Sequence, residues 1–252
     1  MKHIKKISKK IAILTIIGFI SIPLLLTYLV TGLYDVLRQN SDQHFYILKR
    51  YFYGNGGLTW IFSPLNLIID VVSLPFVNKQ IYKLDDFPKK YQDEINEITV
   101  GCEPDKLLEK MQGQLEKNER ALLLYKWYGH NVGDGSGQPN FHKKFKYILT
   151  IGLSVFNANE KTKEHFGWFR AGVRVLYNID PVIQDGAYIV VNGFRHDWKK
   201  DGRLFIFDDT LMHQSFNLTD TPRHCLFIDI VRPSYIPVVL TDWLWLYPET
   251  YQ

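Results

Sequence analysis

A series of short apolar segments in the second half of the chain constrains the fold more than any other feature of the sequence. From about residue 146 onward, apolar side chains alternate with polar ones, which is the period of a β-strand with one face in a core. Such short strands, bounded by turn residues, favour a mainly β fold built as an antiparallel double sheet, such as a jelly roll. The segments are residues 146–156, 172–179, 187–193, 203–209 and 224–231.

Turn and helix signals add to this prediction. Asn192-Gly193 predicts a hairpin turn between two of the segments, because this dipeptide tolerates the positive φ values of a tight hairpin turn. Upstream, residues 85–98 and 103–129 show helical spacing of apolar side chains, and Pro104 suits the start of a helix. We therefore expect α-helices that flank the sheets.

The N-terminal segment is apolar for longer than a cleaved signal peptide requires. Residues 11–30 carry no charge, and about twenty such residues match the hydrocarbon thickness of a bilayer. The apolar run continues to about Tyr34, whereas the apolar region of a signal peptide is shorter. We predict an uncleaved transmembrane helix. The positive-inside bias then places the N-terminus in the cytoplasm, because lysines precede the helix at Lys2, Lys5, Lys6, Lys9 and Lys10.

A second apolar stretch, residues 58–77, is open to two interpretations. Its length fits a second membrane crossing, yet Asn66 and Asp70 lie within it, and a charge at the centre of a bilayer is costly. The stretch could instead lie in the membrane interface, with Trp60 at the level of the headgroups. One crossing would export the C-terminal domain, and two crossings would return it to the cytoplasm.

These boundaries divide the chain into three parts. We predict a cytoplasmic tail and transmembrane helix over residues 1–34, a linker with the second apolar segment over 35–77, and a globular domain over 78–252. The lipid bilayer is the expected partner. The net charge is +4 and much of it lies in the first ten residues, so no broad basic surface argues for a nucleic-acid partner.

Polar residues beside the predicted strands indicate a site for a small anion. Arg174 falls at an inward strand position and Arg223 opens the last strand. A buried guanidinium without a partner is costly, so two such arginines favour a dicarboxylate held by forked hydrogen bonds. His165 and His213 lie near the ends of strands, and Ser154 lies within one.

The run from His165 to Pro233 reads HFGWFRAGVRVLYNI, then FIFDDTLMHQSFNLTDTPRHCLFIDIVRP after a short interval. It resembles the aspartyl/asparaginyl β-hydroxylase family, which includes the bacterial lipid A hydroxylase, and the resemblance covers about residues 145–235. The resemblance implies a dioxygenase that depends on Fe(II), 2-oxoglutarate and O₂. It also implies a double-stranded β-helix, a variant of the jelly roll.

Position by position, the resemblance implies a role for each candidate residue. His165 and His213 match the two histidines that bind the iron. Ser154 and Arg223 fall where the distal carboxylate of 2-oxoglutarate is held, and Arg174 matches an arginine that helps to hold this cosubstrate.

The chain departs from the family pattern at two positions. Gly167 stands where many related enzymes carry a third, carboxylate ligand. The aspartyl/asparaginyl hydroxylases also have glycine there, whereas lipid A hydroxylases keep an aspartate. Leu176 stands where a histidine is common, and leucine cannot hydrogen-bond to the cosubstrate.

We therefore predict a membrane-anchored dioxygenase that hydroxylates an unactivated C–H bond of a protein Asp or Asn side chain or of a lipid acyl chain. The alternatives are a catalytically inactive binding protein with the dioxygenase fold and a membrane-tethered scaffold without metal. Two further residues have competing interpretations: Asp208 and Asp209 either orient His213 or cap a turn. His196 is expected on the surface of a strand.

Overall fold

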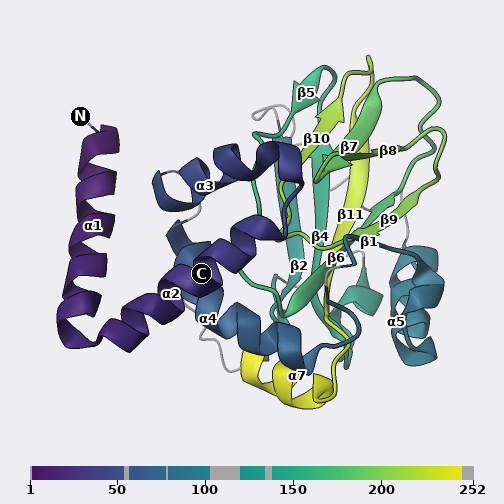
Figure 1. Ribbon diagram of the computed structural model, residues 1–252. Coiled ribbons are helices and arrows are strands. Elements are labelled where there is room, and N and C mark those ends of the chain that lie inside the picture. Colours follow the sequence, from purple (N-terminus) through teal and green to yellow (C-terminus); the bar gives the residue numbers. More distant parts are fainter. Residues whose placement is uncertain (1, 54–56, 78, 103–119, 134–137, 246–252) are drawn as a thin grey trace.

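The computed structural model describes residues 2–53, 57–77, 79–102, 120–133 and 138–245. Two antiparallel sheets face each other across a cavity, and helices surround them (Figure 1). This arrangement confirms the predicted mainly β double sheet.

The larger sheet has seven strands in the order β1-β9-β6-β11-β4-β2-β3. Its central strand β11 pairs along its length with β4 on one side and β6 on the other. Strand β4 is buried at eight of its nine positions, which suits a strand covered on both faces. The strands are β1 (Ile81–Tyr82), β9 (Leu204–Phe207), β6 (Gly172–Asn178), β11 (Arg223–Val231), β4 (Ile148–Phe156), β2 (Arg120–Trp127) and β3 (His130–Asn131).

The smaller sheet contains β5 (Glu160–Lys161), β10 (His213–Asn217), β7 (Ala187–Val191) and β8 (Phe194–Asp197), in the order β5-β10-β7-β8. The predicted turn at Asn192-Gly193 is confirmed, because their φ values are 50° and 87°. Its second strand is β8 and not residues 203–209. A strand of four residues gives too short an alternation to be recognised in the sequence.

Strand β2 corrects the second helix prediction. Residues 120–127 form a strand that pairs with β4 and β3, although helical spacing over 103–129 predicts a helix. Pairing with the buried strand β4 outweighs the weak local preference for helix. The rest of that prediction, residues 103–119 with Pro104, lies outside the described residues.

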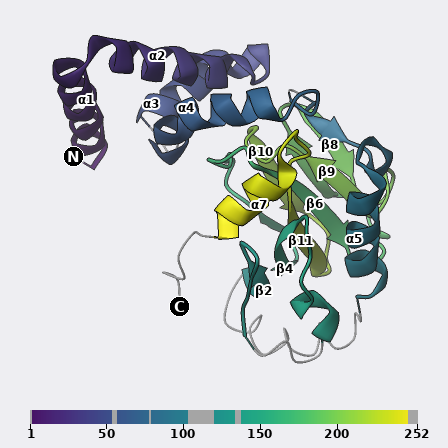
Figure 2. The same cartoon turned by 90° about the horizontal axis from the view of Figure 1, so that it is seen from below.

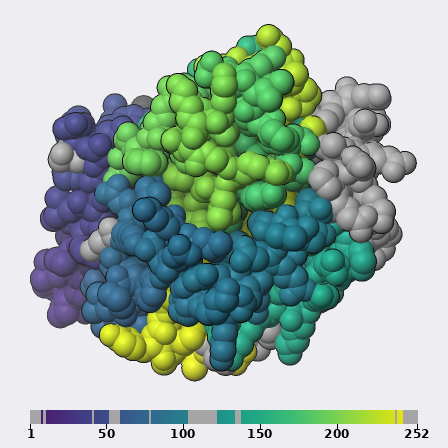
Figure 3. All heavy atoms as spheres, turned by 90° about the vertical axis from the view of Figure 1, so that its right-hand side faces the viewer, coloured from purple at the N-terminus to yellow at the C-terminus, as the bar shows by residue number. Residues whose placement is uncertain are grey.

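Helices cover the sheets on several sides (Figures 1 and 2). The predicted helix over 85–98 is confirmed as α5 (Lys89–Val100), which lies at the opposite end of the molecule from α1. Figure 3 views the molecule from the α5 side, where the surface of this helix lies below the strands of the smaller sheet. The other helices among the described residues are α1 (Lys2–Ile20), α2 (Ile22–Leu37), α3 (His44–Tyr53), α4 (Gly57–Val72), α7 (Pro237–Trp245) and three short 3-10 turns, η1 (Ser41–Gln43), η2 (Leu84–Asp86) and η3 (Pro139–His142).

The helix predicted over the N-terminal apolar run is divided in two. Ser21 has extended φ and ψ angles of −164° and 116°, and its hydroxyl accepts a hydrogen bond from the backbone N–H of Leu24. Pro23 lacks a backbone N–H, so it fits the first turn of α2 better than the interior of one long helix. Helix α1 therefore ends at Ile20 and stands apart from the sheets (Figure 1).

Among the helices that the structure describes, none combines the length and the apolar composition needed to cross a bilayer.

Candidate metal and cosubstrate site

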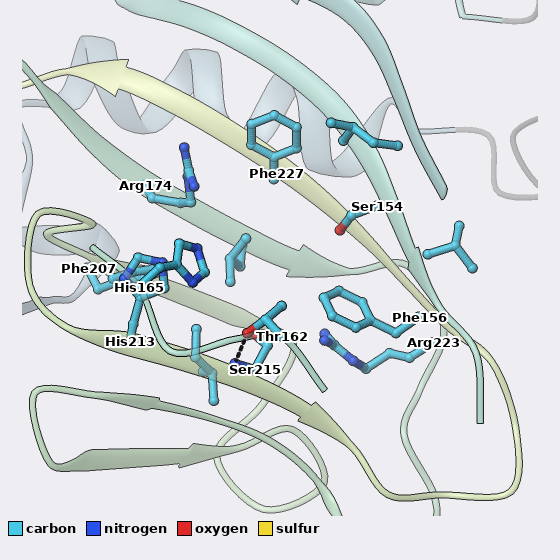
Figure 4. Close-up of a pocket in the computed structure, with 14 residues that line it drawn as sticks. Ser154, Phe156, Thr162, His165, Arg174, Phe207, His213, Ser215, Arg223 and Phe227 are labelled. Carbon is cyan, nitrogen blue, oxygen red and sulfur yellow. Dashed lines mark hydrogen bonds between the residues drawn. The ribbon is translucent and has the colours of Figure 1, made fainter. Parts of the chain in front are cut away.

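A cavity of about 560 Å³ lies between the two sheets, and all five predicted site residues line it (Figure 4). Strands β4, β6 and β11 of the larger sheet supply Ser154, Arg174 and Arg223, whereas β10 supplies His213. The other lining residues are Leu122, Val155, Phe156, Thr162, Leu176, Ile189, Phe207, Ser215 and Phe227. The fold thus gathers residues that are far apart in the sequence.

His165 and His213 face each other in an isolated antiparallel β-bridge. The backbone N–H of each donates to the carbonyl of the other, at 3.0 and 2.8 Å. Residues paired in this way present their side chains on the same face, and the centroids of the two imidazole rings are 4.2 Å apart. In Figure 4 both rings lie at one end of the cavity. The structure therefore brings the two predicted metal ligands together.

Hydrogen bonds fix the orientation of both rings. Nδ1 of His165 lies 2.7 Å from the carbonyl of Lys163, and Nδ1 of His213 lies 2.8 Å from the carbonyl of Leu211. A carbonyl oxygen can only accept, so we assign the proton to Nδ1 and the ring lone pair to Nε2 in each neutral histidine. Burial, together with the nearby His165, lowers the pKa of His213 to about 3. The ring is therefore neutral at physiological pH, as metal binding requires.

No group of three or more His, Cys, Asp or Glu side chains with the geometry of a metal site occurs among the described residues. The space that a side chain at Gly167 would need is taken by Asp209, because a Cβ atom there would lie 2.8 Å from both carboxylate oxygens. Among the described residues, the site therefore offers the imidazoles of His165 and His213 as candidate metal donors. Such a pair fits an ion such as Fe(II), whose other positions are left to a cosubstrate and water.

Arg223 is a buried cation, and no carboxylate among the described residues compensates its charge. Its side chain forms no salt bridge within the described part of the chain, it is 4% exposed, and its Nε has no hydrogen-bond partner. Nη1 donates to Oδ1 of Asn178 at 3.0 Å, and the rings of Phe156 and Trp198 lie 4.6 and 5.2 Å from the guanidinium carbon. Burial lowers the pKa of Arg223. A buried arginine of this kind favours an anionic ligand.

Arg174 lines the same cavity but has two carboxylate partners. Its Nε and Nη2 donate to the two oxygens of Asp229 at 2.8 and 3.1 Å, and Nη2 lies 3.3 Å from Asp209. Burial alone would lower the pKa of Arg174, but these two carboxylates raise it. Burial also raises the pKa of Asp209 to about 6, although Arg174 opposes this. Arg223 is therefore the stronger candidate for an anionic ligand, and the role of Arg174 stays a prediction.

The structure resolves the two interpretations of Asp208. Its Oδ1 accepts hydrogen bonds from the backbone N–H and the hydroxyl of Thr210, at 3.0 and 2.6 Å, and Oδ2 pairs with Arg38 and Arg232, both at 2.8 Å. Asp208 therefore caps the turn that leads to His213. The idea that Asp208 orients the imidazole is wrong, because Leu211 takes that hydrogen bond.

Several residues that shape the cavity escaped the sequence analysis. Asp229 lies directly opposite Arg174 in the register of β6 and β11, so knowledge of the strand order would have revealed it. Alternation along the strand does place Asn178 on the same face as Arg174, but it does not reveal the hydrogen bond between Asn178 and Arg223. Thr162 accepts a 2.9 Å hydrogen bond from the backbone of Ser215 and lies in no predicted element.

The prediction for His196 is wrong. The side chain is buried, and its ring packs against Phe205 and Trp198 with centroid distances of 4.4 and 4.6 Å. His196 does lie on a strand, β8, but its ring points into the core instead of toward solvent.

Comparisons with known proteins agree with this geometry. Residues 137–233 match the family model described as aspartyl/asparaginyl beta-hydroxylase. The ornithine lipid ester-linked acyl 2-hydroxylase of Rhizobium tropici is 30% identical over 102 residues. That alignment covers 40% of this chain and 36% of the relative, so the chain spans little more than a third of that protein.

Solved structures are more distant. A cupin domain of an XRE family transcriptional regulator from Enterobacter cloacae is 10% identical, with 44% of this chain and 96% of that chain covered and a TM-score of 0.31. Salicylate 1,2-dioxygenase from Pseudoaminobacter salicylatoxidans is 15% identical, with 56% and 32% covered and a TM-score of 0.32. Similarity at this level carries no argument about function. The sequence matches support the resemblance to a family: residues 137–233 are similar to the aspartyl/asparaginyl beta-hydroxylase family model, and the acyl hydroxylase of Rhizobium tropici is similar over a comparable length.

Proposed function

We propose that this protein is an Fe(II)- and 2-oxoglutarate-dependent dioxygenase that hydroxylates a C–H bond of a lipid acyl chain. One observation carries the proposal: a pair of adjacent imidazoles and an uncompensated buried guanidinium line the same cavity. An iron chelate and an anionic cosubstrate need these two features together.

Each residue has a distinct role in this proposal. His165 and His213 hold Fe(II) through Nε2. Arg223 binds the distal carboxylate of 2-oxoglutarate, and the hydroxyl of Ser154, which donates to the carbonyl of Cys225 at 3.2 Å, lies on the neighbouring strand. Bound iron with 2-oxoglutarate and O₂ supplies the oxidising power. One oxygen atom enters the C–H bond to give C–OH, and the other enters succinate as 2-oxoglutarate loses CO₂.

The lining of the cavity supports an apolar substrate. Leu176, Ile189 and Phe227 contribute apolar walls, and Leu122 lines the cavity although it is 55% exposed. Leu122 therefore marks a side from which a flexible acyl chain can enter. The curated relative is named for the hydroxylation of an acyl chain of ornithine lipid, which favours this substrate class over Asp or Asn side chains.

The N-terminal helices support a membrane surface as the place of action. They expose many large apolar side chains, and monomeric soluble proteins rarely expose so many together. The first half of α1 contains five lysines, and basic, apolar helices bind anionic lipid surfaces. The exposed residues are Ile11, Ile13, Ile16, Phe19 and Ile20 on α1, Ile22, Leu24, Leu26, Leu29, Val30, Leu33 and Leu37 on α2, and Ile61, Ile68 and Val71 on α4.

The test uses the full chain with Fe(II), 2-oxoglutarate and O₂. Liposomes that contain an acylated amino lipid are offered in one arm, and a peptide that contains Asp and Asn in the other. We expect a mass increase of about 16 Da, one oxygen atom, on the lipid, with one succinate formed per hydroxylation. His165→Ala and His213→Ala should abolish both signals.

Three results would contradict the proposal in different ways. An increase on the peptide alone would assign a protein substrate. Binding of 2-oxoglutarate without any turnover would identify an inactive binding protein with the dioxygenase fold. Failure to bind any divalent metal would leave the membrane-tethered scaffold without metal as the remaining interpretation.

A further inference from the structure

Both histidine segments are held in place by residues from the N-terminal helices. Helices α2, α3 and α4 lie beside the strands that carry the site (Figure 1), and hydrogen bonds run from residues 35–70 to the chain around His165 and around His213. None of the helical residues lines the cavity between the sheets. They can therefore act on the site through the backbone that carries the two ligands.

Gln39 holds the turn before His213. Its side-chain Nε2 donates to the carbonyl of Thr210 at 3.1 Å, and its Oε1 accepts from the backbone N–H of Met212 at 2.9 Å. The amide thus spans Leu211, whose own carbonyl accepts the hydrogen bond from Nδ1 of His213. Gln39 is 7% exposed, so water competes poorly for these hydrogen bonds. A continuous chain of contacts therefore leads from Gln39 to the imidazole.

Arg50 and Asn66 hold the segment around His165. Nη2 of Arg50 donates to the carbonyl of Glu164 at 2.7 Å, and Nη1 lies 3.6 Å from the sulfur of Met212. One guanidinium therefore touches the residue before each histidine. Asn66 donates to the carbonyl of Trp168 at 3.1 Å and accepts from the N–H of Arg170 at 3.0 Å.

Buried ion pairs attach the same helices to the sheets. Arg170 pairs with Asp35 of α2 and with Asp70 of α4, and Arg38 pairs with Asp208 at 2.8 Å. The side chains of these residues are at most 5% exposed. Separation of the helices from the sheets would leave charges buried without partners, which is strongly unfavourable. The helices thus have one fixed position relative to the histidines.

We propose that Gln39 and Arg50 are positioning residues of the two-histidine site, so that the N-terminal helices support the metal site through these two side chains and are not a separable membrane attachment. This inference rests on the proposed function. Partners that orient a metal-binding imidazole are typically worth ten- to a hundredfold in metal affinity, and a site with two protein ligands depends on their mutual orientation more than a site with three.

The experiment measures binding of Mn(II) alone by the full chain, without turnover, beside the thermal unfolding temperature without metal. We expect Gln39→Leu and Arg50→Met each to weaken Mn(II) binding by about tenfold or more. Gln39→Glu keeps the acceptor for Met212, and Arg50→Lys keeps one donor for Glu164, so both should recover part of the affinity. This recovery is a response that a purely structural role would not produce.

Tyr51→Phe is the matched control. The Tyr51 hydroxyl hydrogen-bonds to Asp35 on α2 and to Ser63 on α4, and phenylalanine keeps the ring that stacks on Phe166. This variant should lower the unfolding temperature and leave the Mn(II) affinity within about twofold of the wild type. If Gln39→Leu or Arg50→Met fails to fold, the comparison rests on Gln39→Glu and Arg50→Lys, which must then bind Mn(II) more weakly than Tyr51→Phe does.

The two proposals fail in distinguishable ways. If the wild type binds no Mn(II), the proposed function fails. If the wild type binds Mn(II) and the Gln39 and Arg50 variants bind it equally well, or lose affinity only in proportion to stability as Tyr51→Phe does, the positioning role is wrong and the proposed function stands.

Discussion

Arg223 on β11 donates a 3.0 Å hydrogen bond to Asn178 at the end of the neighbouring strand β6. The amide orients the guanidinium without compensating its charge. Arg174 lies four residues before Asn178 on β6, and its guanidinium instead donates hydrogen bonds to both carboxylate oxygens of Asp229. The two arginines of the cavity therefore differ in whether a carboxylate neutralises the guanidinium charge, and an anionic cosubstrate needs a charge that is not neutralised. The difference lies in the partner side chain, which is Asp229 for Arg174 and Asn178 for Arg223.

Asn178→Asp should convert Arg223 into a compensated arginine. A carboxylate at this position keeps the acceptor oxygen but supplies the counter-charge that 2-oxoglutarate would otherwise provide. Hydrogen bonds to charged groups contribute roughly 1.5–3 kcal/mol, so we expect the affinity for 2-oxoglutarate to fall by about tenfold or more. Titration of the Mn(II)-loaded protein with 2-oxoglutarate measures this effect. The unfolding temperature should not fall, and unchanged affinity in a folded variant would show that Arg223 does not bind the cosubstrate.

Gly167→Asp should not restore a three-ligand site. A Cβ atom at Gly167 would lie 2.8 Å from both oxygens of Asp209, so the new carboxylate would meet an existing one. Forced overpacking costs about 1–3 kcal/mol, and repulsion between the carboxylates adds to this. We expect lower stability and weaker Mn(II) binding in this variant.

The double variant Gly167→Asp with Asp209→Gly is the control for this prediction. It removes the clash, so stability and Mn(II) affinity should both recover relative to Gly167→Asp alone. Denaturant unfolding and Mn(II) titration measure the two quantities. A single variant as stable as the wild type would show that the Asp209 side chain moves aside easily.

The sequence permitted the central part of the site to be predicted but not its support. The roles of His165, His213 and Arg223 were predicted because short motifs around them resemble those of a known family. Asp229 acts across strands, and Gln39 acts from the turn that follows α2. Their roles therefore depend on a register and a packing arrangement that alternation does not encode. Strands of two to five residues, such as β8 and β10, likewise take their stability from neighbouring strands and not from local propensity.

The N-terminal helices illustrate the same limit. A mean apolar character over residues 11–34 predicts one long helix, but Ser21 and Pro23 together end one helix and start another. Within residues 58–77, Asn66 and Asp70 are polar residues in a mainly apolar stretch. The structure explains them, because both bind the segment around Arg170.

Because His196 is buried, we expect the free energy of unfolding to fall at acidic pH. Burial lowers its pKa, and the carbonyl of Gly202 only partly opposes this. Below the ordinary histidine pKa of about 6.5, His196 binds a proton in the unfolded chain but stays neutral in the folded protein. The free energy of unfolding therefore falls as the pH drops from this value toward the lowered pKa of His196 in the folded protein. His196→Gln should remove this contribution, which is at most about 1.4 kcal/mol per pH unit.

The measurement is urea unfolding of the metal-free protein between about pH 7 and pH 5, a window around the ordinary pKa of histidine. His213 has the same sign of dependence, because its pKa is also lowered, so the difference between wild type and variant isolates His196. Parallel stability curves for the two proteins would contradict the prediction.

Gly152 gives Phe227 its place in the wall of the cavity. The two residues are partners in the pairing of β4 with β11, and a Cβ atom at Gly152 would fall on the Phe227 ring. Gly152→Ala should therefore push the ring toward the cavity and cost about 1–3 kcal/mol of stability. Because Phe227 also lies under Arg174, 5.1 Å from its guanidinium carbon, the displaced ring should hinder an acyl substrate more than it hinders Mn(II). We expect a raised KM for the lipid with unchanged Mn(II) affinity.

The double variant Gly152→Ala with Phe227→Leu is the control. It should regain the wild-type KM, since the smaller leucine side chain leaves room for the added methyl group. A double variant with a KM as high as that of Gly152→Ala would show that the Phe227 ring is not what narrows the cavity.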